Sequence, residues 1–532
     1  MRGDRLLGSA VLVGVSAVAF ALGFPPTRWT TLSWIALAPF FVALRGGGTA
    51  RALGLAWLWC VIGACVAGSW FPAAVSEYFH QGPLVALGLF VAVFSLMAGP
   101  YVMAFAVVYR GLARRWGPVA LAFLAGAAWT AAELGRGRLL TGTPLFIGNP
   151  WALAGYAHAP HLALVQIASV TGIYGVSFCV ACVNGAVAEL WRARGAAAQR
   201  RALAVLALAV LPAAASLAYG HRVLSGATPG DGARPVAVAI AQANLAIGAH
   251  WRSDLYGQNL AEYLELTREA ARRGRPALVF WPESAMTFFV EKEPAYREAI
   301  ARVIRALDLE LVAGAPRRAG SKADPRYWNS VYVLGPQGAL RGRYDKEYLV
   351  PFAEYFPIGI DVLRRRFGRI RSFEHGTETA PLPTRAGPAG VLICNEAMLP
   401  EVAADRVAQG AAYLVNPSND SWISDPQYTQ QQFDIASLRA IEQRRYLVRV
   451  STAGPSAVID PLGRVRVRTR ALARDLALGE VRPVEQRSIY GTVGDLFGAT
   501  CGLVVAAALV FRRPRPGRDQ ARSDAGSRAA TR

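Results

Sequence analysis

Cys394 stands directly after the apolar run Val391–Ile393 and is the only cysteine between residues 229 and 490. If the chain turns sharply there from strand into helix, the thiol is presented to substrate and backbone N–H groups point at a developing oxyanion. A thiolate at such a turn is an effective nucleophile for covalent catalysis. A free cysteine also packs well as a small hydrophobe, so a structural core cysteine is the open alternative.

Glu283 closes a second apolar run, in the sequence Trp281-Pro282-Glu283-Ser284. A carboxyl group beside apolar neighbours tends to have a raised pKa and can serve as a general base or acid. A turn residue without chemistry would occupy the same place, so this signal alone is weak.

Lysine is rare in this chain, which draws attention to Lys346. Only three of the 57 basic residues are lysines, and Lys292 and Lys322 lie in polar surroundings typical of solvated charges. Lys346 instead precedes the apolar stretch Leu349-Val350-Pro351-Phe352. Arginine is a broad fork that stays charged, whereas lysine is a compact donor with a tunable pKa. Lys346 therefore suggests a task that arginine cannot perform, with a solvated loop charge as the alternative.

The elements that would position these residues alternate between strand-like and helix-like patterns. Predicted strands lie at Val236–Gln242, Ala277–Trp281, Leu311–Ala315, Ser330–Leu340 (as a hairpin), Gly390–Cys394, Ala412–Asn416 and Tyr446–Thr452. Predicted helices lie at Leu255–Arg273, Pro294–Leu307 and Tyr428–Arg445. This alternation predicts a layered α/β domain over residues 229–490. No Walker-type or Rossmann glycine pattern and no paired-cysteine or histidine spacing indicates a nucleotide or metal site.

Long apolar segments surround this domain, and a membrane span needs about 20 such residues. Seven precede the domain and one follows it: Leu6–Leu22, Thr31–Leu44, Ala52–Phe71, Leu84–Tyr109, Pro118–Glu133, Val165–Trp191, Ala202–Tyr219 and Val493–Phe511. We therefore expect a transmembrane domain over residues 1–228, a last span within 491–512 and a basic, disordered tail at 513–532.

The net charge of +21 comes largely from arginines whose distribution indicates how the chain is oriented in the membrane. With the N-terminus inside, eighteen arginines fall on inward segments and only Arg28, Arg136 and Arg138 on short outward loops. The positive-inside rule then places both termini in the cytoplasm and residues 229–490 outside it. The charge thus gives no indication of nucleic-acid binding. Arg136 and Arg138 oppose the bias, and we expect them to pair with a phospholipid head group.

In the order Glu283, Lys346 and Cys394, these positions resemble the catalytic trio of the nitrilase superfamily over about residues 235–480. With the apolar segments on either side, the chain is similar to the apolipoprotein N-acyltransferase family. The resemblance implies a polytopic α-helical membrane protein with an inserted extracytoplasmic α/β nitrilase-type domain, an αββα sandwich. It also implies a bacterial inner-membrane location, with this domain in the periplasm, and a monomer.

The resemblance further implies a mechanism with Glu283 as proton acceptor, Lys346 as oxyanion stabiliser and Cys394 as nucleophile. Cys394 would take a fatty acyl chain from a membrane phospholipid as a thioester. The α-amino group of a diacylglyceryl-modified apolipoprotein would then accept it. No cofactor, metal or nucleic acid is implied.

Other positions match the family in supporting roles: Glu354, Glu396, Trp251, Asn419, Asp420 and Trp422. Two positions depart from it. Asn395 stands where the family often has a tyrosine, and Ala453-Gly454-Pro455 replaces an asparagine-rich turn. These departures leave the acceptor preference open.

Two other functions compete with acyl transfer. A membrane-anchored amidase or nitrilase would use water as the acceptor, and nothing in the residues excludes water. A transporter or receptor would need no nucleophile, and an ion or proton path would need charges near the span centres, which the apolar segments lack.

Overall fold

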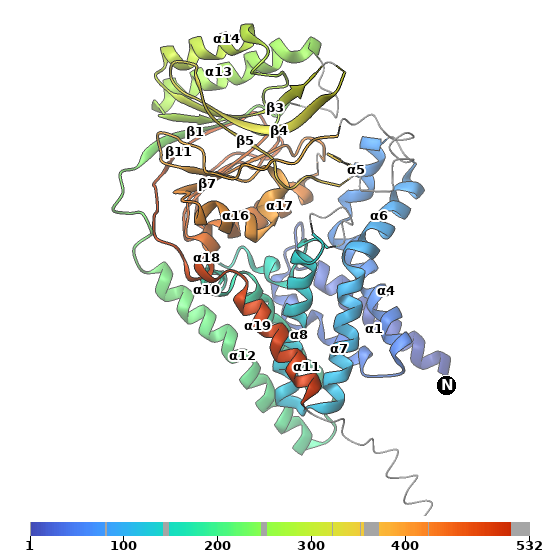
Figure 1. The fold of residues 1–532 in the computed structure, drawn as a ribbon. Helices are drawn as coiled ribbons and strands as arrows, with labels where there is room; N and C mark the ends of the chain where they lie inside the picture. Colours follow the sequence, from blue (N-terminus) through green and yellow to red (C-terminus); the bar gives the residue numbers. More distant parts are fainter. Residues whose placement is uncertain are drawn as a thin grey trace, which may run out of the picture.

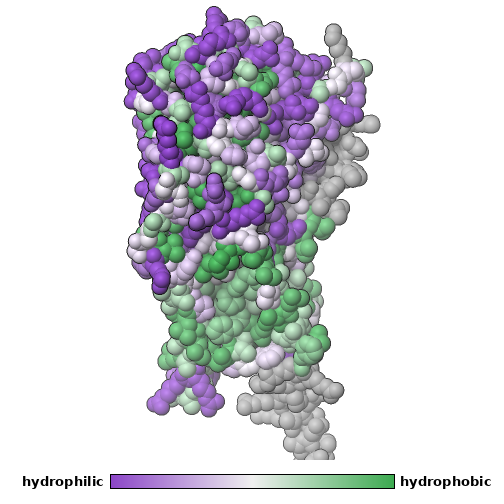
Figure 2. Space-filling model, turned by 60° about the vertical axis from the view of Figure 1, so that its left-hand side comes forward, coloured by the Kyte–Doolittle hydropathy of each residue, from purple (hydrophilic) through white to green (hydrophobic). Residues whose placement is uncertain are grey.

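The computed structural model describes residues 2–79, 82–141, 148–245, 253–321, 323–351, 353–355, 372–423 and 425–511. Within them the chain forms a helical bundle and a two-sheet domain that sits on one end of it (Figure 1). The last helix returns from the two-sheet domain to the bundle. On the face shown in Figure 2, the bundle carries a hydrophobic band below the hydrophilic surface of the two-sheet domain.

The bundle contains the following longer helices: α1 (Arg2–Ala21), α4 (Thr49–Ala67), α5 (Trp70–Phe79), α6 (Pro83–Met97), α7 (Gly99–Arg115), α8 (Pro118–Arg138), α11 (Tyr174–Arg192), α12 (Ala196–Leu224) and α19 (Leu496–Val510). Among the described residues, α4, α8, α11 and α12 are long and apolar enough to cross a membrane. The pair α6 and α7, bent by 48°, would make a fifth span. The other three predicted spans coincide with shorter apolar helices, so a total of eight stays a prediction.

Several expected continuous spans are interrupted, each at a proline or glycine. The segment from Thr31 is divided into short pieces, η1 (Thr30–Leu32), α2 (Ser33–Ala36) and α3 (Ala38–Leu44), with Pro39 in the first turn of α3. Pro100 likewise lies in the first turn of α7, where it cannot continue the hydrogen bonding of α6. Gly172, at a φ of +64°, separates α11 from the short helices before it.

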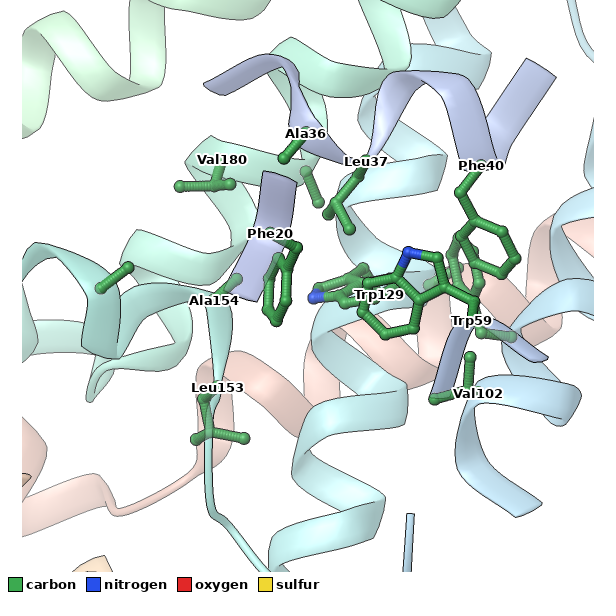
Figure 3. Close-up of a cluster of buried hydrophobic side chains, with 14 of the residues drawn as sticks. Phe20, Ala36, Leu37, Phe40, Trp59, Val102, Trp129, Leu153, Ala154 and Val180 are labelled. Carbon is green, nitrogen blue, oxygen red and sulfur yellow. The ribbon is translucent and has the colours of Figure 1, made fainter. Parts of the chain in front are cut away.

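Aromatic side chains fill the centre of the bundle. Figure 3 shows Trp59 and Trp129 beside Phe20 and Phe40. The rings of Trp59 and Trp129 meet edge to face with centroids 5.5 Å apart, and Phe40 stacks on Trp59 at 5.3 Å. Such contacts add to the dispersion that holds helices together where water is absent.

Two sheets form the second domain. The first has the order β11 (Asp475–Val481), β1 (Val236–Gln242), β2 (Leu278–Phe280), β3 (Glu310–Gly320), β4 (Pro325–Leu334) and β5 (Leu340–Asp345). The second has the order β10 (Val465–Arg468), β9 (Ala457–Ile459), β8 (Leu447–Ser451), β7 (Tyr413–Ser418) and β6 (Ala389–Val391).

Side-chain alternation along β1 shows how the layers form. Val238 and Ile240 pack between the sheets, whereas Ala239 and Ala241 face the helices α13 (Tyr256–Gly274) and α14 (Pro294–Ala306) on the outside. The second sheet is covered by α16 (Pro400–Ala408) and α17 (Pro426–Gln443). These four layers confirm the expected αββα sandwich.

Helix α17 joins the two domains. Its residues Ile435, Leu438 and Ile441 belong to the same hydrophobic cluster as the core of the bundle. Polar contacts flank this cluster: the amide of Gln431 donates to the carbonyl of Ala67 at 2.8 Å. The α16 and α17 face of the sandwich is therefore the one turned toward the bundle (Figure 1).

Candidate active site

Cys394 is the first residue of the short helix η4 (Cys394–Met398), and only Leu392 and Ile393 separate it from the end of β6. Its φ of +53° lies in the left-handed region, which is costly for a residue other than glycine. Surrounding contacts hold this strained turn, since the carboxylate of Glu396 accepts the Ile393 N–H at 2.6 Å and the Asn416 amide donates to the Cys394 carbonyl at 3.2 Å. The expected sharp elbow is present.

Glu283 and Lys346 lie together beside the elbow. Glu283 follows β2 and Lys346 follows β5, and the Lys346 Nζ is 3.8 Å from Glu283 Oε1. Both are buried, at 5% and 1% exposure. Gly314 permits this placement, because a Cβ there would lie 2.6 Å from the Glu283 Cα.

Glu354 and Asn329 complete the cluster. Lys346 Nζ donates to both oxygens of Glu354, at 2.9 and 2.8 Å. The Asn329 amide donates to Glu283 at 2.6 Å and to Glu354 at 2.8 Å, so one side chain bridges the two carboxylates. The second oxygen of Glu283 accepts the backbone N–H of Asn419 at 2.7 Å.

The buried charges shift one another's protonation. Burial raises the pKa of Glu283, against the opposing Lys346 ammonium. Burial disfavours the Lys346 ammonium, but the carboxylates of Glu354 and Glu283 outweigh it and raise the pKa of Lys346. Burial also raises the pKa of the Cys394 thiol, and Glu283 adds to this effect. The site therefore combines a charged lysine, a neutral thiol and a carboxylate able to take a proton.

The remaining expected residues have structural positions around this centre. Glu396 accepts N–H bonds from Glu347 and Tyr348 and so ties the elbow to the loop after Lys346. Asp420 is fully buried, and its carboxylate forms an ion pair with the Arg449 guanidinium at 2.8 Å. This pair anchors the loop that carries Asn419. Trp251 lies outside the described residues.

A cavity of about 230 Å³ opens beside Cys394 and runs between the two domains. From the bundle it is lined mainly by apolar residues of α5 and α6 and by the segment before η2 (Ala154–His158): Trp70, Phe71, Ala74, Val75, Val93, Met97, Thr141, Gly148, Asn149, Pro150 and Trp151. From the sandwich it is lined by Tyr348, Leu349, Val350, Pro351, Ala353, Cys394, Asn395, Met398, Leu399, Trp422, Ile423, Tyr428 and Gln432. An apolar chain that enters between the helices could reach the thiol.

Arg136 and Arg138 both have protein partners, and their pairing with a phospholipid head group stays a prediction. The Arg138 guanidinium pairs with Asp495 at 2.6 Å and with Glu401 at 3.1 Å, so it links α8 to the start of α19 and to α16. Arg136 donates to the carbonyl of Ala152 at 3.3 Å. In the described part of the chain, no cluster of three or more histidine, cysteine or acidic side chains could hold a metal ion.

Sequence reasoning did not identify Asn329 or Tyr428 as parts of the site, and it named Ser418 only as a match to the family next to Asn419 and Asp420. Ser418 Oγ lies 3.6 Å from Cys394 Sγ and 2.7 Å from Asp420 Oδ1. Asn329 could have been found from the hairpin, because its carbonyl accepts the N–H of Lys346 at 2.8 Å, directly across the pair of strands. Tyr428 carries no local signal, since only the packing of α17 against the bundle brings it to the cavity.

Two family models match the chain. The carbon-nitrogen hydrolase model covers residues 237–489, and the apolipoprotein N-acyltransferase N-terminal domain model covers residues 16–186. A relative from Geobacter metallireducens, named apolipoprotein N-acyltransferase, is 34% identical over 509 residues, which are 94% of each chain. A relative of that name from Pseudomonas putida is 30% identical over 489 residues, covering 90% of this chain and 92% of the relative.

These matches span both the bundle and the sandwich, and the sandwich contains the cysteine, lysine and glutamate cluster described above. The chain belongs to the apolipoprotein N-acyltransferase family.

Proposed function

We propose that the chain transfers a fatty acyl group from a membrane phospholipid to the α-amino group of an N-terminal diacylglyceryl-cysteine of lipoproteins. The observation that carries the proposal is the cavity that joins Cys394 to the apolar helices α5 and α6. Water-soluble substrates would not require such a path, whereas a lipid chain gains about 0.8 kcal/mol for each methylene it keeps out of water.

In the first half-reaction, Glu283 takes the Cys394 proton and the thiolate attacks the ester carbonyl of the phospholipid. The Lys346 ammonium has three N–H groups, two of which bind Glu354, so the third can stabilise the tetrahedral oxyanion. The Asn395 backbone N–H, in the first turn of η4, is a second donor. The intermediate collapses to a thioester, and the lysophospholipid oxygen leaves with the proton from Glu283.

In the second half-reaction, the neutral α-amine attacks the thioester carbon. A C–N bond forms, the C–S bond breaks, and the amine proton passes through Glu283 to the leaving sulfur. The thioester supplies the driving force for amide formation, so this ping-pong sequence needs no nucleotide.

The proposal includes the arrangement in the membrane. Residues 1–228 and 491–512 form the transmembrane part, 229–490 the periplasmic catalytic domain of a monomer, and both termini are cytoplasmic. The arginine distribution supports this orientation. The tail at 513–532 lies outside the described residues. A reporter fused after residue 228 should be located outside the cytoplasm, and a reporter fused after residue 511 should be located inside it. The reverse result would exclude the orientation.

The test of the reaction separates transfer from hydrolysis. Purified enzyme is incubated with acyl-labelled phospholipid, with and without a synthetic diacylglyceryl-cysteine peptide. We expect label to appear on the peptide amine, with little free fatty acid. Release of free fatty acid with none on the peptide would instead show a hydrolase that uses water.

A further inference from the structure

Asn395 follows the nucleophile and lines the cavity, and its carboxamide is unused. Its Oδ1 is fully buried and has no hydrogen-bond partner in the part of the chain that the structure describes. The other carboxamides on the cavity are bonded: Asn149 Oδ1 accepts the Trp151 N–H at 2.8 Å, and Gln432 Nε2 lies 3.4 Å from the Tyr428 hydroxyl. A buried acceptor without a donor is costly, so a donor from a ligand is expected.

The backbone around Asn395 is held firmly. Glu396 fixes the turn through the N–H groups of Ile393 and Glu347, and Asn416 holds the Cys394 carbonyl. The backbone that carries the carboxamide is therefore fixed, and Asn395 lines the same cavity as Cys394. A group held on a rigid turn can orient a substrate at little cost in entropy.

The chemistry of the two substrates decides which of them Oδ1 can bind. An unpaired amide oxygen needs an N–H or O–H partner. The reacting ester of a diacyl phospholipid offers only acceptor oxygens. The attacking primary amine offers two N–H groups, of which one loses its proton to Glu283 and the other is free to bind.

We infer that the Asn395 Oδ1 accepts an N–H of the acceptor's α-amino group and directs the nitrogen lone pair at the thioester carbon. This inference rests on the proposed function. It makes the Asn395 side chain an acceptor-binding group that acts in the second half-reaction only, whereas the backbone N–H of the same residue acts on the oxyanion.

The test measures the two half-reactions separately by single turnover in detergent micelles. Asn395→Leu keeps the approximate volume without any polar atom, and Asn395→Asp keeps acceptor oxygens. The donor is a labelled diacyl phospholipid, and the acceptor is a diacylglyceryl-cysteine peptide. Asn259→Leu, the same change on the outer helix α13, is the matched control.

Asn395→Leu removes the carboxamide but keeps the backbone N–H that faces the oxyanion. We therefore expect it to form the thioester within about twofold of the wild-type rate and to transfer it to the peptide about tenfold more slowly. Hydrolysis of the thioester by water should be unchanged, so the ratio of transfer to hydrolysis falls. Asn395→Asp should transfer faster than Asn395→Leu from the preformed thioester.

Wild-type transfer by Asn395→Leu would overturn the inference. An equal loss in both half-reactions would also overturn it, because it would indicate a disturbed elbow. If the wild-type enzyme forms no thioester, the proposed function fails as well, and that result does not depend on any Asn395 variant.

Discussion

Asn329→Leu should remove two hydrogen bonds from the buried carboxylate cluster, while the volume of the side chain stays nearly the same. The Asn329 amide, in a residue that is 8% exposed, donates to Glu283 at 2.6 Å and to Glu354 at 2.8 Å. A hydrogen bond to a charged group contributes about 1.5–3 kcal/mol, so the loss of both should destabilise the protein by about 3–6 kcal/mol. A lowered melting temperature in detergent, compared with Asn259→Leu, measures this effect.

The same substitution should shift the pH dependence of thioester formation. Burial raises the pKa of Glu283, and the hydrogen bond from Asn329 opposes this rise. Without that bond the pKa rises further, and the proposed base must be ionised to act. The rate of Cys394 labelling by phospholipid should therefore fall off at a higher pH than in the wild type. An unchanged acidic limb and an unchanged melting temperature would refute the reasoning.

Three further substitutions have distinct outcomes. Lys346→Met should slow thioester formation by about 10²–10³-fold, and Lys346→Arg should not restore it, because the site is only 1% exposed and cannot fit the broader fork. Ala74→Leu intrudes on the cavity, so rates with long acyl donors should fall more than rates with short ones; an equal loss would place the acyl chain elsewhere. Burial raises the pKa of Glu442, in α17, to about 7, so the folded protein favours the protonated carboxyl group. The contribution of this group to the free energy of unfolding is therefore complete below the ordinary pKa of a glutamate and is lost as the pH rises through about 7. Glu442→Gln should make the melting temperature less dependent on pH across that window. A pH dependence as steep as that of the wild type would contradict this.

Sequence patterns predicted the parts of the site that depend on local chain signals. Cys394, Glu283 and Lys346 each follow a strand of the αββα sandwich, and the structure places the Lys346 Nζ 3.8 Å from Glu283 Oε1. A strand end is readable from an apolar run and the polar residue after it. The scarcity of lysine added a second signal for Lys346.

The contacts between distant segments could not be predicted from the sequence. Trp70, Trp151 and Tyr428 meet at the cavity from three separate regions, with Trp70 and Tyr428 rings 4.7 Å apart. No local periodicity encodes that meeting. The ion pair of Arg138 could not be predicted for the same reason, because its partner Asp495 lies 357 residues away in the sequence.

The boundaries of the apolar segments also differed from expectation. Hydrophobicity indicates that a segment is apolar but not where its helix bends. Pro39 and Pro100 each lie in the first turn of a new helix inside a predicted span. The apolar helix Leu496–Val510, at 15 residues, is shorter than the 20 or so that a straight span needs.

The most direct test of the central claim is mass spectrometry of the purified protein after incubation with a diacyl phospholipid. We expect one acyl group on the peptide that contains Cys394, labile to hydroxylamine and lost when the diacylglyceryl-cysteine peptide is added, with an equal amount of N-acylated peptide formed. Cys394→Ala should show neither the adduct nor the product. Acyl transfer that persists in Cys394→Ala, or an adduct on another residue, would contradict the account.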